Sequence, residues 1–217
     1  MAWAADFSFA RPDLALLKQA GCSGICRYAT GPGKAVDQAE IDQAVALGLA
    51  VVIVQEGGNQ PALRGFQGGV ADARQANSRL DSLGNYPPDC CIYFVAEDPN
   101  RLAPSAWPTV DTYFQGVHSV GGRPVGGYGS LDMLNHLEQA GLIVYKWAVG
   151  PWGGNAGCHL SQYSAPVPAQ FLNVIDANLI LADDYGQHPR PPAPRPPTSE
   201  THTQYRGFTT VTARSIS

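Results

Sequence analysis

Carboxylate, aromatic and amide side chains stand at or near the ends of short apolar segments along most of the chain. The acidic members are Asp6, Glu56, Glu97 and Asp176, and their companions are Tyr128, Trp147 and Gln162. Facing carboxyl groups suit the hydrolysis of a glycosidic bond. One carboxylic acid protonates the leaving oxygen, and a second carboxylate acts as nucleophile or as base on water. Crowding raises the pKa of one member and keeps it protonated near neutral pH.

Glu97 is the candidate general acid within this set. Side chains alternate along a strand, so Tyr93, Val95 and Glu97 are expected on one side while Asp98 points the other way. Asp6 or Asp176 would then act as nucleophile or base. A lone aspartate at a strand end often only caps a helix or accepts a hydrogen bond in a loop. The occurrence of three carboxylates at one end of the predicted barrel therefore indicates acid/base chemistry.

The roles of two further charged residues, Glu56 and Arg27, each have two interpretations. Glu56 is either a site residue or a solvated loop residue. Arg27 either pairs with a central carboxylate near the substrate or acts as a structural counter-ion, and the structural role is preferred. The aromatic rings of Tyr128 and Trp147 are expected to stack on the apolar faces of sugar rings.

Other kinds of chemistry find no support. Gly31-Pro32-Gly33-Lys34 lacks the first glycine and the Ser/Thr of a phosphate loop, and no Gly-x-Ser-x-Gly motif is present. The five histidines show no metal-ligand spacing, so neither a metal nor a cofactor is expected. The five cysteines are expected to be buried, reduced thiols.

Eight short apolar segments must position these side chains. They cover residues 4–8, 24–28, 49–54, 91–96, 124–128, 142–147, 159–163 and 174–180, and predicted helices separate most of them. Strands that alternate with helices imply a parallel sheet, and eight strands suggest closure into a barrel. We therefore predict an α/β fold of the (β/α)8 type, a TIM-like barrel that is irregular after strand six. The carboxyl ends of the strands form the active face of such a barrel.

Length and composition agree with one such barrel and exclude several partners. The chain has 217 residues, of which 44% are hydrophobic and 15% are charged, and its formal net charge is -4. Nucleic acid is not expected, because no basic stripe is present. No apolar run reaches the ~20 residues that span a membrane.

The C-terminal part changes composition. Residues 1–187 are predicted to form the barrel, and residues 188–217 a Pro-rich extension. Within that extension, residues 188–197 are predicted to form a polyproline II linker, and residues 205–212 a strand that needs a sheet edge to join. Two interpretations of residues 198–217 stay open: they bind a protein partner or an assembly, or they pack on their own barrel.

The order and spacing of six motifs resemble a known family. The motifs are Asp6-Phe7-Ser8, Gly24-Ile25-Cys26-Arg27-Tyr28, Ile92-Tyr93-Phe94-Val95-Ala96-Glu97, Gly126-Gly127-Tyr128, Gln162-Tyr163 and Ile175-Asp176-Ala177-Asn178. Together they resemble the glycoside hydrolase-like domain of unknown function found in actinobacterial secreted proteins and their phages, a family related to family 25 lysozymes. The resemblance implies an acidic cluster of Asp6, Glu97 and Asp176. It also implies that Tyr128, Trp147 and Gln162 line the substrate groove. The lysozymes carry an Asp-x-Glu pair on strand four, whereas Val95 stands two residues before Glu97 here.

We therefore expect a glycoside hydrolase-like protein that acts on a cell-wall, peptidoglycan-type glycan by carboxylate acid/base chemistry. The alternative is a catalytically silent module that binds glycan or serves as a structural part of a phage virion, such as a tail protein, anchored by its C-terminal tail. The expected location is extracellular or virion-associated. No classical signal peptide is expected, because Met1 to Asp6 show no basic region followed by an apolar run.

Overall fold

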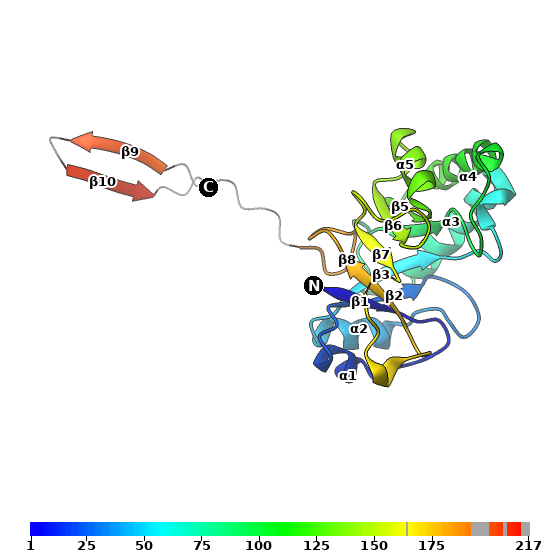
Figure 1. The fold of residues 1–217 in the computed structure, drawn as a ribbon, viewed down its shortest axis with the longest axis horizontal. Helices are drawn as coiled ribbons and strands as arrows, with labels where there is room; N and C mark the ends of the chain where they lie inside the picture. The colour runs from blue at the N-terminus through cyan, green and yellow to red at the C-terminus, as the bar shows by residue number, and fades with distance from the viewer. Residues whose placement is uncertain (164, 192–199, 206–207, 214–217) are drawn as a thin grey trace.

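Eight strands close into a barrel in the computed structural model, which describes residues 1–163, 165–191, 200–205 and 208–213. The strands are β1 (Trp3–Asp6), β2 (Gly24–Tyr28), β3 (Ala50–Gln55), β4 (Ile92–Val95), β5 (Val125–Gly129), β6 (Tyr145–Val149), β7 (Leu160–Gln162) and β8 (Asp176–Ile180). They follow one another around the barrel in sequence order, and β8 closes it against β1 (Figure 1). The predicted α/β barrel is confirmed.

Helices cover the outside of the first six strands. They are α1 (Leu14–Gln19), α2 (Gln38–Ala46), α3 (Gly65–Asp81), α4 (Trp107–Val120) and α5 (Leu131–Gln139), with the 3-10 turns η1 (Pro61–Arg64) and η2 (Pro104–Ala106). After β6, the only helical element in the described residues is the 3-10 turn η3 (Ala169–Phe171). The expected irregularity after strand six is therefore confirmed.

The direction of the last strand departs from the predicted parallel sheet. β8 runs antiparallel to both β7 and β1, and Asp6 is the register partner of Asp176. The two residues therefore meet at one end of the barrel, although Asp6 ends its strand and Asp176 begins its own. Apolar segments alternating with helices do not encode the direction of a strand that no α-helix precedes.

Three of the helices begin directly after a residue whose side chain caps the N-terminus of the helix. Asp13, Asp37 and Ser130 are N-caps whose side chains accept hydrogen bonds from backbone N–H groups of the first helical turn. α3 and α4 then pack closely through glycines. A side chain at Gly69 would collide with the carbonyl oxygen of Tyr113, and one at Gly116 with that of Phe66.

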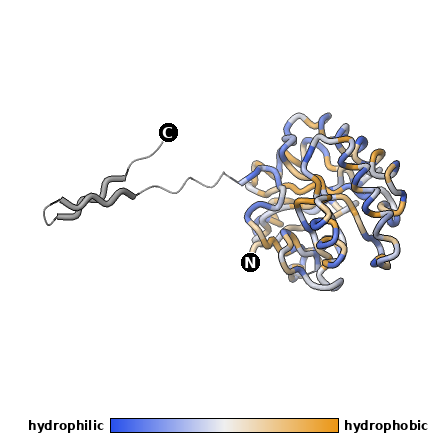
Figure 2. The backbone as a smooth tube through the Cα atoms, turned by 90° about the horizontal axis from the view of Figure 1, so that it is seen from above, coloured by the Kyte–Doolittle hydropathy of each residue, from blue (hydrophilic) through white to orange (hydrophobic). Residues whose placement is uncertain are grey.

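Side chains fill the barrel interior, so it is a packed core. Its members are Ala4, Cys26, Val52, Val54, Cys91, Tyr93, Val95, Trp147, Leu160 and Tyr185. A second, larger apolar layer lies between the strands and the helices. Hydrophobic segments run through the middle of the body, while hydrophilic ones lie mostly toward its periphery (Figure 2). All five cysteines are buried and unpaired in this described structure, as expected.

The segment after β8 covers the barrel end opposite the carboxyl ends of β1–β7. Tyr185 is buried there and its carbonyl accepts a 2.8 Å hydrogen bond from the Tyr93 hydroxyl. His188 pairs with Val51 through two backbone hydrogen bonds, and Arg190 contacts the Tyr145 hydroxyl at 2.9 Å. Contacts with the barrel thus continue through Arg190.

The described C-terminal residues form a hairpin of β9 (Glu200–Tyr205) and β10 (Phe208–Ala213). Two paired strands therefore replace the single strand expected over 205–212. Residues 192–199, 206–207 and 214–217 lie outside the described part, and they include most of the predicted linker and part of the expected partner-binding segment. Among the described helices, none is long and apolar enough to cross a membrane.

Candidate active site

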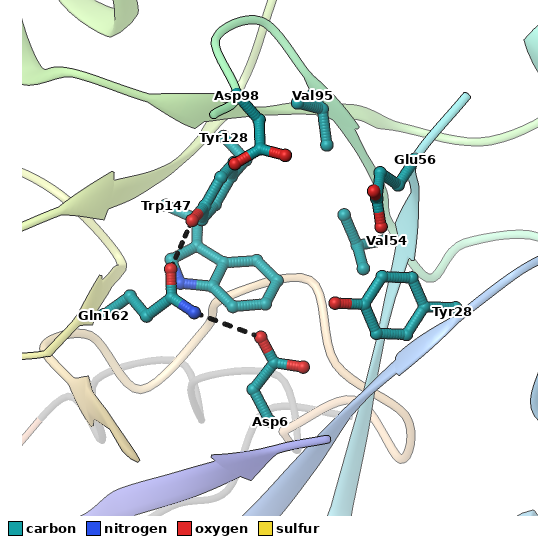
Figure 3. A pocket seen from close by; sticks show the side chains of 9 residues that line it. All are labelled: Asp6, Tyr28, Val54, Glu56, Val95, Asp98, Tyr128, Trp147 and Gln162. Carbon is teal, nitrogen blue, oxygen red and sulfur yellow. Dashed lines mark hydrogen bonds between the residues drawn. The ribbon is translucent and has the colours of Figure 1, made fainter. Parts of the chain in front are cut away.

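A cavity of about 320 Å³ opens at the end of the barrel where β1–β7 finish. Carboxyl groups and aromatic rings dominate its wall (Figure 3). The lining residues are Asp6, Tyr28, Val54, Glu56, Val95, Asp98, Tyr128, Trp147 and Gln162.

The strands place these side chains by their two-residue alternation. Ala4 on β1 and Val52 on β3 belong to the packed interior, so Asp6, Val54 and Glu56 continue the same inward-facing rows. Tyr28 continues the row of Cys26 on β2 in the same way. The cavity is therefore the open top layer of the barrel interior.

Asp6 is only 7% exposed and holds an unusual charge state. Burial, followed by the neighbouring charge of Asp176, raises the pKa of its carboxyl group to about 8, although Arg27 acts in the opposite direction. Its Oδ2 accepts a 3.3 Å hydrogen bond from Nε2 of Gln162. Its Oδ1 is buried without a hydrogen-bond partner among the described residues. Asp6 therefore carries a proton at neutral pH.

Asp176 lies beside Asp6, where a second hollow adjoins the cavity. Burial raises the pKa of Asp176, whereas hydrogen bonds from Tyr163 and Gln162, both 3.3 Å long, lower it. Asp6 and Tyr28 line both hollows, so the two form one continuous depression along the junction of β1 and β8.

Glu56 and Asp98 form the opposite side of the cavity from Asp6 (Figure 3). Glu56 is paired with Lys34 at 2.6 Å, and the Lys34 ammonium also lies 4.5 Å from the centre of the Tyr28 ring. Burial and the neighbouring Glu56 raise the pKa of Asp98, and Lys34 lowers it. The structure thus places Glu56 at the site, with its charge balanced by Lys34.

Trp147 forms the floor of the cavity and is 1% exposed. Its ring meets the Tyr93 and Tyr128 rings edge to face, with centroid distances of 5.6 and 5.2 Å. Its indole N–H donates to Asn178 at 2.8 Å. The Tyr128 hydroxyl donates to Oε1 of Gln162. Tyr128, Trp147 and Gln162 therefore lie together at the site, as the sequence predicted.

Glu97 lies outside the cavity, which corrects the expected orientations of both Glu97 and Asp98. β4 ends at Val95 and the chain bends at the next two residues, so the alternation stops before Glu97. Its buried carboxylate accepts 2.7 Å hydrogen bonds from the backbone N–H groups of Leu102 and Ser130. Glu97 thus connects the loop after β4 with the start of α5, and Asp98 enters the cavity in its place.

Arg27 does not line the cavity either, so its expected contact with substrate is not supported by the geometry. The guanidinium is fully buried, pairs with Glu40 at 2.9 Å and lies 4.4 Å from the centre of the Phe7 ring. It also donates to the carbonyl oxygens of Phe7, Ser8 and Lys34. Arg27 therefore holds together the loops that follow β1 and β2, which is the structural role.

Among the polar residues that line the cavity, sequence reasoning missed two, Asp98 and Tyr28. Tyr28 stands two residues after Cys26, so alternation along β2 could have found it. Asp98 gave no such signal, because only the bend after Val95 turns it inward. Within the described residues, no group of three or more His, Cys, Asp or Glu side chains is arranged to hold a metal ion.

An eight-stranded α/β barrel with carboxyl groups and aromatic rings at the carboxyl ends of its strands defines a glycoside hydrolase-like barrel. The chain belongs to the family of the Rv2525c-like, glycoside hydrolase-like domain, whose family model matches residues 15–179. A comparison with curated proteins finds no match.

Solved structures share this barrel. The Tat-secreted protein Rv2525c of Mycobacterium tuberculosis, in complex with HEPES, is 24% identical with a TM-score of 0.73, over 85% of this chain and 98% of that one. The catalytic domain of endolysin ply40, from bacteriophage P40 of Listeria monocytogenes, is 14% identical with a TM-score of 0.54, over 84% and 94%. GHIP, a glycosyl hydrolase 25 of Streptococcus pneumoniae, is 15% identical with a TM-score of 0.50, over 82% and 86%. The fold is thus related to that of lysozymes and endolysins.

Proposed function

We propose that the protein hydrolyses a glycan of the bacterial cell wall with two carboxyl groups of this cavity, Asp6 and Asp98. The observation that carries the proposal is their arrangement: they stand on opposite sides of the cavity with the Trp147 ring between them (Figure 3). Glycoside hydrolysis needs two carboxyl groups that flank the bond to be cut. The half-buried rings of Tyr28 and Tyr128 in the cavity wall offer surfaces for a sugar ring.

The two carboxyl groups take different roles because their surroundings differ. Asp6 holds a proton at neutral pH, with a pKa of about 8, so it protonates the leaving oxygen as general acid. Asp98 is half-buried, and its carboxylate acts as nucleophile or as base on water. Asp176 supports Asp6, because its negative charge raises the Asp6 pKa. Glu97 is not assigned the acid role, because both of its oxygens accept backbone N–H groups outside the cavity.

The class of substrate is proposed by analogy with related barrels. One of them is the catalytic domain of a phage endolysin, and another is a glycosyl hydrolase 25. Rv2525c is a Tat-secreted protein, and we extend an extracellular location to this chain on that ground. A place in a phage virion, with assembly through residues 198–217, stays a prediction.

The test is the release of reducing ends from purified actinobacterial cell wall. We expect release by the wild type, and a loss of roughly 10²-fold or more in Asp6→Asn and Asp98→Asn, which remove the acid and the carboxylate. Asp89→Asn is the matched control, because Asp89 is exposed and precedes β4 at the far end of the barrel. Equal release by Asp6→Asn and the wild type would contradict the assignment.

A second candidate function is glycan binding without cleavage. The nearly complete burial of Asp6 and its hydrogen bond to Gln162 favour this alternative, because a general acid must reach the leaving oxygen. Sedimentation of the protein with the same cell walls separates the two functions. Wall binding with no release of reducing ends by the wild type would identify a binding module.

A further inference from the structure

One side-chain amide bridges the two carboxyl groups at the junction of β1 and β8. Nε2 of Gln162 donates to Oδ2 of Asp6 and to Oδ2 of Asp176, each at 3.3 Å. On its other side, Oε1 of Gln162 accepts a hydrogen bond from the Tyr128 hydroxyl. The bridge thus connects four strands, β5, β7, β1 and β8 (Figure 3 shows the Tyr128, Gln162 and Asp6 members).

We propose that Tyr128 and Gln162 are positioning residues that determine how the carboxyl groups of Asp6 and Asp176 hold their protons. This inference rests on the proposed function, in which Asp6 is the general acid. Neither residue transfers a proton itself. The Tyr128 hydroxyl orients the amide, and the amide supplies N–H donors to both carboxyl groups.

The orientation of the amide follows from its neighbours. An amide has a donor side and an acceptor side, and hydrogen-bond partners decide which side faces where. With Oε1 turned toward the aspartates, both carboxyl groups would need a proton to make a hydrogen bond to it. With Nε2 turned toward them, each carboxyl group accepts a hydrogen bond through one of its oxygens. The Tyr128 hydroxyl, which donates to Oε1, stabilises this second arrangement.

The amide N–H groups favour ionised carboxylates, whereas burial favours protonated ones. For Asp176, the hydrogen bond from Gln162 lowers the pKa against the effect of burial. Asp6 is more deeply buried and also faces the charge of Asp176, so the proton stays on Asp6. Because Oδ2 of Asp6 accepts from Gln162, Oδ1 is the oxygen that carries the proton of Asp6. Rotation about the terminal carboxyl torsion, which is broad and roughly two-fold, can present this proton.

Other charged and titratable groups face this pair, and Gln162→Leu and Tyr128→Phe leave them unchanged. They are Arg27 and Tyr28 on β2, Lys34 in the loop after β2, Glu56 after β3, Asp98 after β4 and Tyr163 after β7.

The experiment is a pH titration of the full chain, labelled with ¹³C at the aspartate carboxyl carbons and followed by NMR. Asp6→Asn and Asp176→Asn assign the two signals. In Gln162→Leu, which removes the N–H donors, we expect the Asp176 titration to move up by about one pH unit, because a donor to the charged form is lost. Tyr128→Phe removes one hydroxyl and is expected to shift the same signal upward by less.

Tyr28→Phe is the control for the titration, since it removes the same hydroxyl group from the same cavity but no described contact to Gln162. An unshifted Asp176 signal in both Gln162→Leu and Tyr128→Phe would overturn the proposal. Tyr128→Phe alone decides if Gln162→Leu does not fold, and circular dichroism checks the fold of each variant. The titration needs no substrate, so a failure to cut cell wall would count against the proposed function and leave this result intact.

Discussion

Replacing Glu97 by glutamine is predicted to destabilise the barrel. The buried Glu97 carboxylate accepts two backbone N–H groups, from Leu102 and Ser130, each at 2.7 Å. Glutamine keeps the shape, but its amide nitrogen would face one of these N–H donors and leave that donor unsatisfied. The other hydrogen bond would then be made to a neutral acceptor instead of a charged one.

The expected cost follows from the two bonds. An unsatisfied buried donor costs about 1–3 kcal/mol, and a hydrogen bond to a charged group contributes more than a neutral one, so we expect a loss of about 2–3 kcal/mol. For a chain of this length that lowers the melting temperature by roughly 4–12 °C.

Differential scanning calorimetry measures this loss directly. Asp132→Asn is the control, because it makes the same carboxylate-to-amide change at an exposed residue of α5, where Asp132 pairs with Arg101. We expect the free energy of unfolding of this variant to stay within about 0.5 kcal/mol of the wild type. In the reducing-end assay at a temperature where both variants are folded, Glu97→Gln should keep more activity than Asp98→Asn. Wild-type melting together with a complete loss of activity would refute the structural role of Glu97 and restore it as the acid.

Three further predictions concern stability. The raised pKa of Asp6 means that the folded state holds a proton which the unfolded state releases near pH 4, so stability should fall as pH rises toward about 8. In urea unfolding from pH 4 to 8.5, Asp6→Asn should make the free energy of unfolding less dependent on pH than in the wild type. Parallel pH profiles of the two proteins would contradict the prediction. Trp147→Ala should cost about 3–5 kcal/mol in the same assay at pH 7, because a buried indole leaves a cavity. A chain ended after Pro191 should melt like the full chain, whereas one ended after Ala182, which lacks the buried Tyr185, should lose several degrees or fail to fold.

The barrel could be predicted because its signals are local. Each strand is a short apolar run, and the capping residues Asp13, Asp37 and Ser130 stand where the helices begin. The direction of β8 could not be predicted in this way. The segment between β7 and β8 is a loop with one 3-10 turn, so its sequence shows no helical pattern. The direction of β8 depends on how that loop packs.

The candidate site could be predicted wherever alternation persists to the end of a strand. Asp6, Tyr128, Trp147 and Gln162 follow this rule and lie together. Glu97 and Asp98 do not, because the chain leaves the strand at Val95 and the next side chains follow the bend. Arg27 shows a different limit, since its partners are mostly backbone carbonyl oxygens and a glutamate of α2, which strand periodicity does not identify.

The pairing of β1 with β8 has a consequence for how the protein is made. Asp6 leaves the ribosome well before its register partner Asp176, which comes near the end of the barrel sequence. The burial and the neighbouring charge that give Asp6 its proton therefore do not exist until the last strand has been synthesised and has paired. Contacts so distant in sequence form late, since the entropy of closing the intervening chain must be overcome first. The acid of the proposed reaction thus forms only when β8 pairs with β1, and a growing chain that lacks β8 carries an ordinary aspartate at that position.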